Sequence, residues 1–203
     1  MRLYIIRHGQ TPWNLEYRMQ GRTDIPLNEN GRGLARRTAK GMADIPFDLA
    51  FTSPLARAKE TALLVLNGRR IPLIEEERLC EVCFGEMEGT RFDKVEGRIK
   101  SEEFADFFYA PERYTPPEGG ETIEELLART GAFLDELKAR EELQNQTILV
   151  STHGAASRAL LLNIRHGQKK DFWGTGVPKN CAVSIVELQD GDWRIIEQDV
   201  VFA

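Results

Sequence analysis

Short apolar runs alternate with longer amphipathic segments along most of this chain. A run of about four to eight apolar or β-branched residues between polar ones is typical of a buried strand, and apolar positions three or four apart are typical of a helix. The runs predict strands at residues 3–6, 49–52, 71–74, 147–151, 183–188 and 193–197. The spacing predicts helices at residues 28–42, 53–66, 92–109, 122–143 and 155–164. Alternating strands and helices favour an α/β fold, a three-layer sandwich with helices on both faces of a mostly parallel central sheet.

Cap and turn residues mark several of these boundaries. Thr11 and Ser53 are each followed by proline, which suits the first position of a helix. Thr122, with Glu125 three residues later, forms a capping box ahead of the next predicted helix. Residues 189–192, Gln-Asp-Gly-Asp, are typical of a tight turn, so the last two strands are expected to form a C-terminal antiparallel hairpin.

The pentapeptide Ile-Arg-His-Gly-Gln occurs twice, at residues 6–10 and at residues 164–168. In the first copy His8 follows a buried strand and precedes a helix, where open α/β sheets bind their ligands. The second copy ends a predicted helix, so Arg165 and His166 complement the helix dipole and Gly167 is expected to take the left-handed cap position. We therefore assign chemistry to the first copy and a helix terminus to the second.

Two further strands end in residues of the same kind. His153 comes directly after the strand and turn Thr-Ile-Leu-Val-Ser-Thr and precedes a helix, and Arg57 lies near the first turn of the helix after the strand at 49–52. Ligands bind at the carboxyl ends of such strands, so Arg7, His8, Arg57 and His153 are expected to converge there. Arginine binds two oxygens at once and helix starts offer free N–H groups, so the convergence predicts an anion pocket.

The motifs that carry these residues follow one another in a set order. They are RHGQTPWN (7–14), LNENGRGLA (27–35), TSPLARAKETA (52–62), LCEVCFGEMEG (79–89), PPEGGET (116–122) and VSTHG (150–154). This ordered set spans nearly the whole chain and resembles the histidine phosphatase superfamily, also called the phosphoglycerate mutase-like family. The resemblance is to a short phosphatase-type member. It implies a metal-independent phosphomonoester hydrolase acting on small organic phosphates, α-ribazole phosphate or a phosphoglycerate among the candidates.

The resemblance also implies a role for each site residue. His8 attacks phosphorus through a neutral ring nitrogen, and water then hydrolyses the phosphohistidine. Glu81 gives the leaving alkoxide its proton, because a neighbouring phosphate dianion disfavours ionisation of a carboxyl group. Glu86 and Glu88 are expected to be solvated. The implied catalytic residues are His8, Glu81, His153, Arg7 and Arg57, and the implied substrate-binding residues are Arg7, Asn14, Gln20, Gly21, Arg57, Glu81, His153, Gly154 and Ala155.

Composition narrows the class of partner. The 203 residues suit a single domain spanning 1–203, and the formal net charge of −5 argues against nucleic acid as a partner. No apolar run approaches the ~20 residues of a membrane span, so no membrane association is expected. Three cysteines, an odd number, do not suggest a disulfide framework and favour the cytoplasm. We expect a monomer or homodimer that binds a small-molecule phosphomonoester without a cofactor or a metal.

Three alternatives stay open. Cys80 and Cys83 form a C-x-x-C pair, which is typical of a redox-active pair or of half a zinc site. Cys181 is isolated, however, and no second pair of ligands follows. A non-catalytic phosphate-binding module is a further possibility, against which the presence of His8, Glu81 and His153 argues.

A phosphoglycerate mutase is the closest competitor. Mutases of the family resemble longer chains that close over the substrate, whereas here only residues 90–115 separate two motifs. That segment holds FADFFYA (104–110), which predicts either a helix packed on the core or an apolar wall above the pocket, built from Phe104, Phe107, Phe108 and Tyr109. The nearby cations Arg98 and Lys100 could still reach over the pocket, so the mutase remains an alternative.

Overall fold

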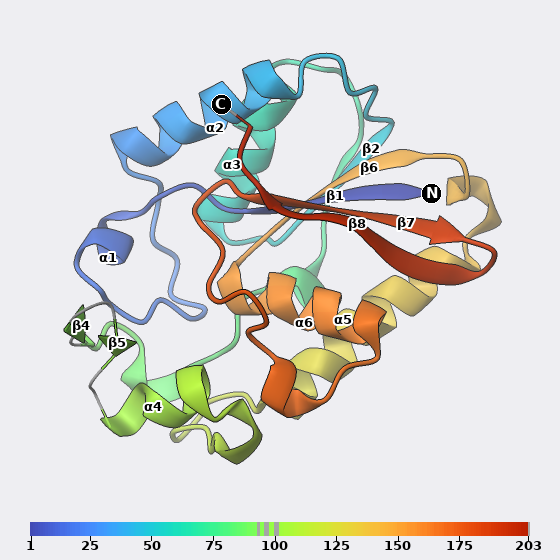
Figure 1. The fold of residues 1–203 in the computed structure, drawn as a ribbon. Coiled ribbons are helices and arrows are strands. Elements are labelled where there is room, and N and C mark those ends of the chain that lie inside the picture. Colours follow the sequence, from blue (N-terminus) through green and yellow to red (C-terminus); the bar gives the residue numbers. More distant parts are fainter. Residues whose placement is uncertain (93, 96–97, 100–101, 203) are drawn as a thin grey trace.

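A six-stranded mixed sheet forms the centre of the protein, in a computed structural model that describes residues 1–92, 94–95, 98–99 and 102–202 (Figure 1). Its strands are β1 (Arg2–Arg7), β2 (Leu49–Thr52), β3 (Leu73–Glu75), β6 (Thr147–Thr152), β7 (Val183–Gln189) and β8 (Asp192–Val200). The strand order is β3-β2-β6-β1-β7-β8. The first four strands in this order pair in parallel, and β7 and β8 form the antiparallel hairpin. The predicted fold class is therefore confirmed.

Helices cover both faces of this sheet. On one face lie α2 (Glu29–Gly41) and α3 (Ala56–Leu66), and on the other α5 (Ile123–Ala139) and α6 (Gly154–Arg165) (Figure 1). The short helix α1 (Pro12–Leu15), the hairpin of β4 (Lys94–Val95) and β5 (Arg98–Ile99), and α4 (Glu102–Tyr109) lie towards the end where β1 finishes. Single 3-10 turns occupy Glu77–Leu79, Gly85–Met87, Pro111–Arg113, Glu141–Leu143 and Lys169–Asp171.

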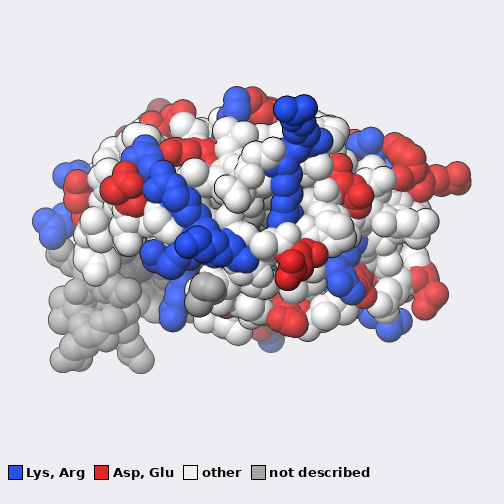
Figure 2. Space-filling view, turned by 90° about the horizontal axis from the view of Figure 1, so that it is seen from above, with Lys and Arg blue, Asp and Glu red and all other residues white. Residues whose placement is uncertain are grey.

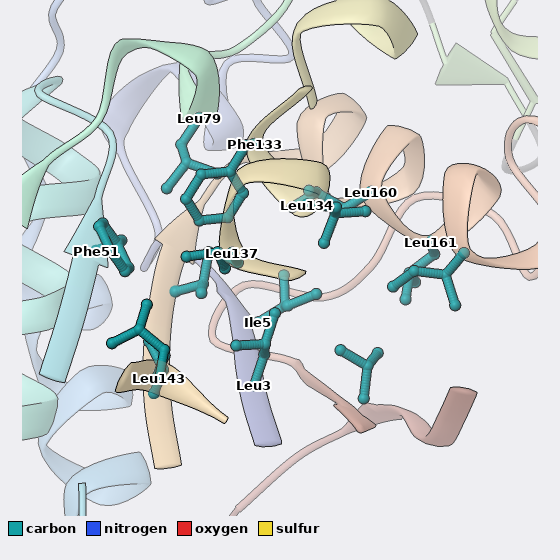
Figure 3. Packing of buried hydrophobic residues seen from close by; sticks show 14 of the residues in the cluster. Leu3, Ile5, Phe51, Leu79, Phe133, Leu134, Leu137, Leu143, Leu160 and Leu161 are labelled. Carbon is teal, nitrogen blue, oxygen red and sulfur yellow. The ribbon is translucent and has the colours of Figure 1, made fainter. Parts of the chain in front are cut away.

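Strand β1 shows why its sequence reads as a continuous apolar run. Leu3 and Ile5 pack into the cluster beneath α5 and α6, where Phe133 and Leu160 meet them (Figure 3). Tyr4 and Ile6 point to the opposite face and belong to the cluster beneath α2 and α3. Side chains alternate between faces along a strand, so a strand covered on both faces needs apolar residues at every position.

Two predicted helices begin later than their sequence signals. The helix predicted from Ser53 starts at Ala56, and its N-cap is Leu55, whose apolar side chain makes no cap bond. The Ser53 hydroxyl lies outside the helix, 3.4 Å from the N–H of Leu55 and 2.8 Å from His153 Nε2. The helix predicted from residue 92 is helical only over Glu102–Tyr109 within the described residues. Residues 94–95 and 98–99 pair as antiparallel strands instead, in line with the β-branched residues they contain. Residues 93, 96–97 and 100–101 of that prediction lie outside the described part of the chain.

Two other boundaries shift by a few residues. The capping box of Thr122 and Glu125 is confirmed, but α5 ends at Ala139 and residues 141–143 form a separate 3-10 turn. The predicted strand 71–74 is observed at Leu73–Glu75. Pro72 has no N–H to contribute to a strand ladder, so the strand begins after it.

The second pentapeptide is a helix terminus, as its neighbours predict. Helix α6 ends at Arg165, but the left-handed residue is His166, with φ 50°, rather than the predicted Gly167. A Cβ at Gly167 would lie 2.4 Å from Cδ1 of Leu162, so a larger residue there would require that side chain to move.

Charged side chains of both signs spread over the face above α2 (Figure 2). One ion pair joins α2 to α3, Arg32 with Glu60 at 2.6 Å. Among the described residues no helix is long and apolar enough to cross a membrane.

Candidate active site

The carboxyl ends of β1 and β6 bring the two histidines together. Arg7 pairs with Thr152 in the parallel register, and the N–H of His8 donates to Thr152 O at 2.9 Å. The ring centroids of His8 and His153 lie 5.2 Å apart. Gly9 permits this arrangement, because a Cβ there would lie 2.7 Å from the Gly31 carbonyl oxygen of α2.

His8 is held as a neutral ring with one nitrogen ready to react. Its Nδ1 lies 2.7 Å from the carbonyl oxygen of Gly9. A carbonyl only accepts hydrogen bonds, so Nδ1 carries the hydrogen and Nε2 keeps its lone pair. Burial, followed by the charges of Arg57 and Arg7, lowers the pKa of His8 well below its ordinary value. The side chain therefore stays neutral, which is the state in which an imidazole can act as a nucleophile.

His153 orients Arg57. The Nε–H of Arg57 donates to Nδ1 of His153 at 3.2 Å, so the hydrogen of His153 sits on Nε2 and donates to Ser53 Oγ at 2.8 Å. Burial, then the charge of Arg57, lowers the pKa of His153 well below its ordinary value. The rest of the Arg57 guanidinium donates to Thr23 O at 2.8 Å and Gly21 O at 2.6 Å. These bonds fix the position of the buried cation.

Glu81 caps helix α6. Its Oε2 accepts the N–H of Ala155 at 3.2 Å, and its Oε1 accepts the N–H of Ala156 at 3.0 Å and that of Val82 at 3.1 Å. Free N–H groups at a helix start favour an anion. Ala155 is one of the residues that the sequence predicts to bind substrate, and its N–H is the group that could bind a phosphoryl oxygen. A phosphate bound there would therefore compete with this carboxylate for one donor.

Arg7 offers a second donor at the same place. Its Nη1 donates to the carbonyl oxygen of Pro178, while its buried Nε has no partner among the described atoms. A Cβ on Gly154 would lie 3.7 Å from this Nε and 3.6 Å from Oε2 of Glu81. Burial lowers the pKa of Arg7 to about 10, so the guanidinium remains charged at neutral pH. An unpaired buried donor beside a helix start is suited to an anionic ligand.

Asn14 and Gln20 are held by a small polar network. Oδ1 of Asn14 accepts the N–H of Thr11 at 3.0 Å and Nδ2 of Asn180 at 3.3 Å. Its Nδ2 is therefore the atom with hydrogens to offer an anion. The Thr11 hydroxyl donates to Oε1 of Gln20 at 3.0 Å. Asn180 also donates to His8 O at 3.1 Å, a contact that sequence reasoning missed because nothing in the local pattern marks it.

A cavity of about 290 Å³ opens over these groups. All of the predicted site residues line it except His153, which lies behind Arg57 with both ring nitrogens bonded. Residues that line it without having been predicted are Gln10, Tyr17, Arg18, Met19, Phe84, Phe92, Trp173, Val177 and Asn180. The cavity therefore combines the cations Arg7 and Arg57, called here the cationic floor, with a largely apolar surround of aromatic side chains, Met19 and Val177.

The aromatic segment of α4 supplies part of that surround. Phe107 and Phe108 line the cavity, as one of the two readings of this segment predicts. Phe104 is instead buried in the cluster beneath, and Tyr109 is 55% exposed and lies outside the lining. The ring of Phe108 stacks on Trp173 at 5.4 Å, and the indole N–H of Trp173 donates to Phe107 O at 2.6 Å.

Glu88 is not a solvated residue, contrary to the sequence prediction. Its carboxylate accepts the N–H groups of Arg22 and Thr23 at 2.8 Å and of Phe84 at 3.1 Å. Burial opposes ionisation, but these bonds outweigh it and lower the pKa of Glu88. Gly21, with φ 52°, leaves room for the carboxylate, since a Cβ there would lie 2.0 Å from its Oε1. Glu88 thus shapes the loop that receives Arg57.

The C-x-x-C pair acquires no further ligands in the part of the chain that the structure describes. Cys80, Cys83 and Cys181 are free thiols. No three His, Cys, Asp or Glu side chains of these residues gather as metal ligands do.

The site combines a neutral buried histidine, two arginines and a helix start at the carboxyl ends of parallel strands, an arrangement of an α/β protein that is suited to an anion. The family model of the histidine phosphatase superfamily (branch 1) matches residues 3–200, and the chain belongs to this superfamily. The predicted family is confirmed.

Individual relatives include both phosphatases and mutases. The chain is 33% identical to the uncharacterized phosphatase PhoE of Bacillus subtilis (strain 168) over 196 residues, 97% of this chain and 93% of that relative. It is 36% identical over 167 residues to the 2,3-bisphosphoglycerate-dependent phosphoglycerate mutase 2 of Gloeobacter violaceus, covering 81% of this chain and 75% of the mutase. The solved structure of Bacillus stearothermophilus YhfR superposes with a TM-score of 0.88 at 32% identity, covering 98% of this chain and 97% of that one.

Proposed function

We propose that this protein hydrolyses phosphomonoesters of small organic alcohols through a covalent phosphohistidine intermediate. One observation carries the proposal: the hydrogen bond from Nδ1 of His8 to Gly9 O leaves Nε2 unprotonated beside two arginines. An unprotonated imidazole nitrogen next to fixed cations is suited to attack a phosphoryl group whose charge those cations neutralise.

The first half-reaction transfers the phosphoryl group. Arg7, Arg57 and Nδ2 of Asn14 bind the phosphoryl oxygens, together with the N–H of Ala155. Nε2 of His8 forms a bond to phosphorus in line with the ester oxygen as the P–O bond breaks. Positioning and charge stabilisation supply most of the rate enhancement in such a transfer. His153 contributes by holding Nε of Arg57 in place.

Glu81 supplies the proton that the leaving alkoxide needs. A phosphoryl oxygen that takes the N–H of Ala155 displaces the carboxylate of Glu81 from it. The carboxyl group carries the proton that it transfers to the leaving oxygen. In the second half-reaction it takes a proton from water as the water attacks phosphorus and the P–N bond to His8 breaks.

The apolar surround indicates the class of alcohol. The cavity that Arg7 and Arg57 line is also lined by five aromatic residues, Phe84, Phe92, Phe107, Phe108 and Trp173. Aromatic side chains bind apolar surface and leave few groups for a second anion. Phosphate esters with an aromatic or other apolar alcohol therefore fit this cavity better than phosphoglycerate does.

A phosphoglycerate mutase is the alternative, and mutases among the relatives favour it. A mutase must hold the carboxylate of its substrate with a cation and exclude water while His8 carries the phosphoryl group. Arg18 lines the cavity, but its charge is already paired with the carboxylate of Glu16 at 2.6 Å, whereas Arg57 donates only to neutral acceptors. The side chain of Arg98 and the whole of Lys100 lie outside the described residues. Hydrolysis is therefore the function that the cavity supports better.

The test measures both activities on one preparation. Phosphate release is assayed on a panel of alkyl and aryl phosphomonoesters without added metal, beside formation of 2-phosphoglycerate from 3-phosphoglycerate with 2,3-bisphosphoglycerate present. We expect hydrolysis to exceed mutase turnover. Mutase turnover well above the best hydrolysis rate would reject the hydrolase, and loss of neither activity in His8→Ala would reject the intermediate.

A further inference from the structure

Arg158 is a buried cation that the proposed mechanism does not use. It lies on α6, three residues after Ala155, and its side chain is 2% exposed. Its Nη2 donates to Asp199 Oδ2 at 2.8 Å and its Nε to Gly176 O at 2.7 Å. The pair gives little net stability, because removing Arg158 from water costs about as much as its attraction to Asp199, which is 25% exposed, returns. The contacts of Arg158 therefore point to a role in positioning the chain at Gly176 rather than in stability.

Asp199 holds the same segment from the other side. Its Oδ2 also accepts the Thr175 hydroxyl at 2.6 Å, and its own N–H donates to Ser184 Oγ at 3.2 Å. Burial opposes the charge of Asp199, but hydrogen bonds from Arg158 and Thr175 lower its pKa. The ionised carboxylate on β8 and the guanidinium on α6 therefore clamp residues 175 and 176 between them.

The segment that this pair clamps, residues 173–180, then runs through the active site. Trp173 and Val177 line the cavity. The carbonyl oxygen of Pro178, two residues after Gly176, accepts from Nη1 of Arg7. Asn180 donates to the carbonyl oxygen of His8 at 3.1 Å. The clamped segment thus touches the nucleophile, a phosphate-binding cation and the aromatic wall.

We propose that the Arg158–Asp199 pair is a positioning device that fixes residues 173–180, and thereby sets both the orientation of Arg7 and the fit of the alcohol against Trp173. The proposal rests on the proposed function, because it assigns the pair a part in that reaction. Neither residue lines the cavity, so both act through residues 173–180.

The test uses a variant that removes the charge of Asp199 and keeps the shape of its side chain. In Asp199→Asn the guanidinium of Arg158 loses its counter-ion, so residues 173–180 lose their fixed position. Displacing a substrate-binding group by about 1 Å can cost on the order of a hundredfold in rate. We expect kcat/KM for 1-naphthyl phosphate to fall about tenfold or more, with weaker inhibition by inorganic phosphate. The preference for 1-naphthyl over glycerol phosphate should shrink.

Asp192→Asn is the matched control on the same strand, because Asp192 is exposed and lies 3.9 Å from its partner Lys138. It should leave the kinetic constants and the substrate preference unchanged. If Asp199→Asn lowers the melting temperature but keeps the wild-type constants and preference, the pair is merely structural and the proposal is wrong.

A second variant and a binding measurement complete the test. If Asp199→Asn does not fold, Thr175→Val removes the hydroxyl contacts to Asp199 and Gln198 and leaves the Arg158–Asp199 pair in place. An unchanged substrate preference in that variant overturns the proposal. If the wild-type protein hydrolyses no phosphomonoester, the proposed function fails, whereas binding of inorganic phosphate still reports on Arg7. Weaker phosphate binding in Asp199→Asn then supports the clamp, and unchanged binding rejects it.

Discussion

Replacing Glu81 by glutamine should have two opposite effects, which together test the competition at the start of α6. The carboxylate accepts the N–H groups of Ala155, Ala156 and Val82. Glutamine keeps the size of the side chain but removes its charge and the proton that it transfers. We expect Glu81→Gln to bind inorganic phosphate more tightly and to turn over alkyl phosphates much more slowly.

The size of the first effect follows from the bond to Ala155. A hydrogen bond to a charged group contributes roughly 1.5–3 kcal/mol and one between neutral groups roughly 0.5–1.5 kcal/mol. Phosphate that takes the N–H of Ala155 therefore displaces a bond weaker by about 1–1.5 kcal/mol in the variant. Since about 1.4 kcal/mol is tenfold, the inhibition constant for phosphate should fall about five- to tenfold.

The size of the second effect depends on the leaving group. General acid catalysis contributes roughly 10²- to 10⁴-fold, and alkoxides need the proton most. Turnover of glycerol phosphate should therefore fall by about that factor in Glu81→Gln, and turnover of p-nitrophenyl phosphate far less. Glu86→Gln is the control, because Glu86 is exposed three residues after Cys83 in the same motif.

Both effects are measured by steady-state kinetics on the two substrates with phosphate as the competitive inhibitor. Unchanged or weaker inhibition by phosphate in Glu81→Gln would show that the carboxylate and phosphate do not share the N–H of Ala155. Equal losses of turnover on both substrates would assign Glu81 to positioning instead of proton transfer.

Four further predictions concern the site and its surroundings. His8→Ala should abolish phosphate release and acid-labile phosphorylation of the protein, whereas His166→Ala should retain both near wild type; the reverse pattern would assign chemistry to the second pentapeptide. Activity should survive exhaustive EDTA treatment, because Arg7 and Arg57 supply the positive charge; loss that a divalent ion restores would contradict this. The lowered pKa values of His8 and His153 mean that the folded protein binds fewer protons than the unfolded chain at acid pH. The free energy of unfolding should therefore fall as the pH drops below about 6.5, by up to ~1.4 kcal/mol per pH unit for each histidine, and urea titrations should show a shallower pH slope for His8→Gln than for wild type. Trp173→Ala should raise KM for 1-naphthyl phosphate about tenfold or more, from the ~1.5–3 kcal/mol of a large apolar contact, and leave glycerol phosphate nearly unchanged; equal effects would remove Trp173 from the specificity wall.

Local sequence determined most of the architecture. The apolar run ahead of His8, the capping box at Thr122 and the hairpin turn at Asp190-Gly191 depend on residues a few positions apart, so pattern and cap chemistry reveal them. The residues around the two pentapeptides also showed that the first copy ends a strand and the second ends a helix. The same local signals failed at Ser53, where the hydroxyl that looks like a helix cap is bonded to His153, 100 residues away in sequence.

Tertiary structure alone decided how the site is assembled. Asn180 reaches the carbonyl of His8 from 172 residues along the chain, and Arg158 meets Asp199 across 41. Trp173 joins the wall only because the chain after α6 folds back over α4 and places its indole on Phe107 and Phe108. No periodicity or cap marks such contacts, because they depend on which surfaces the sheet and helices bring together after they pack. The sequence by itself therefore determined the strands, the helices and the residues at their ends. The packing of the helices on the sheet decided which of those residues form hydrogen bonds with one another.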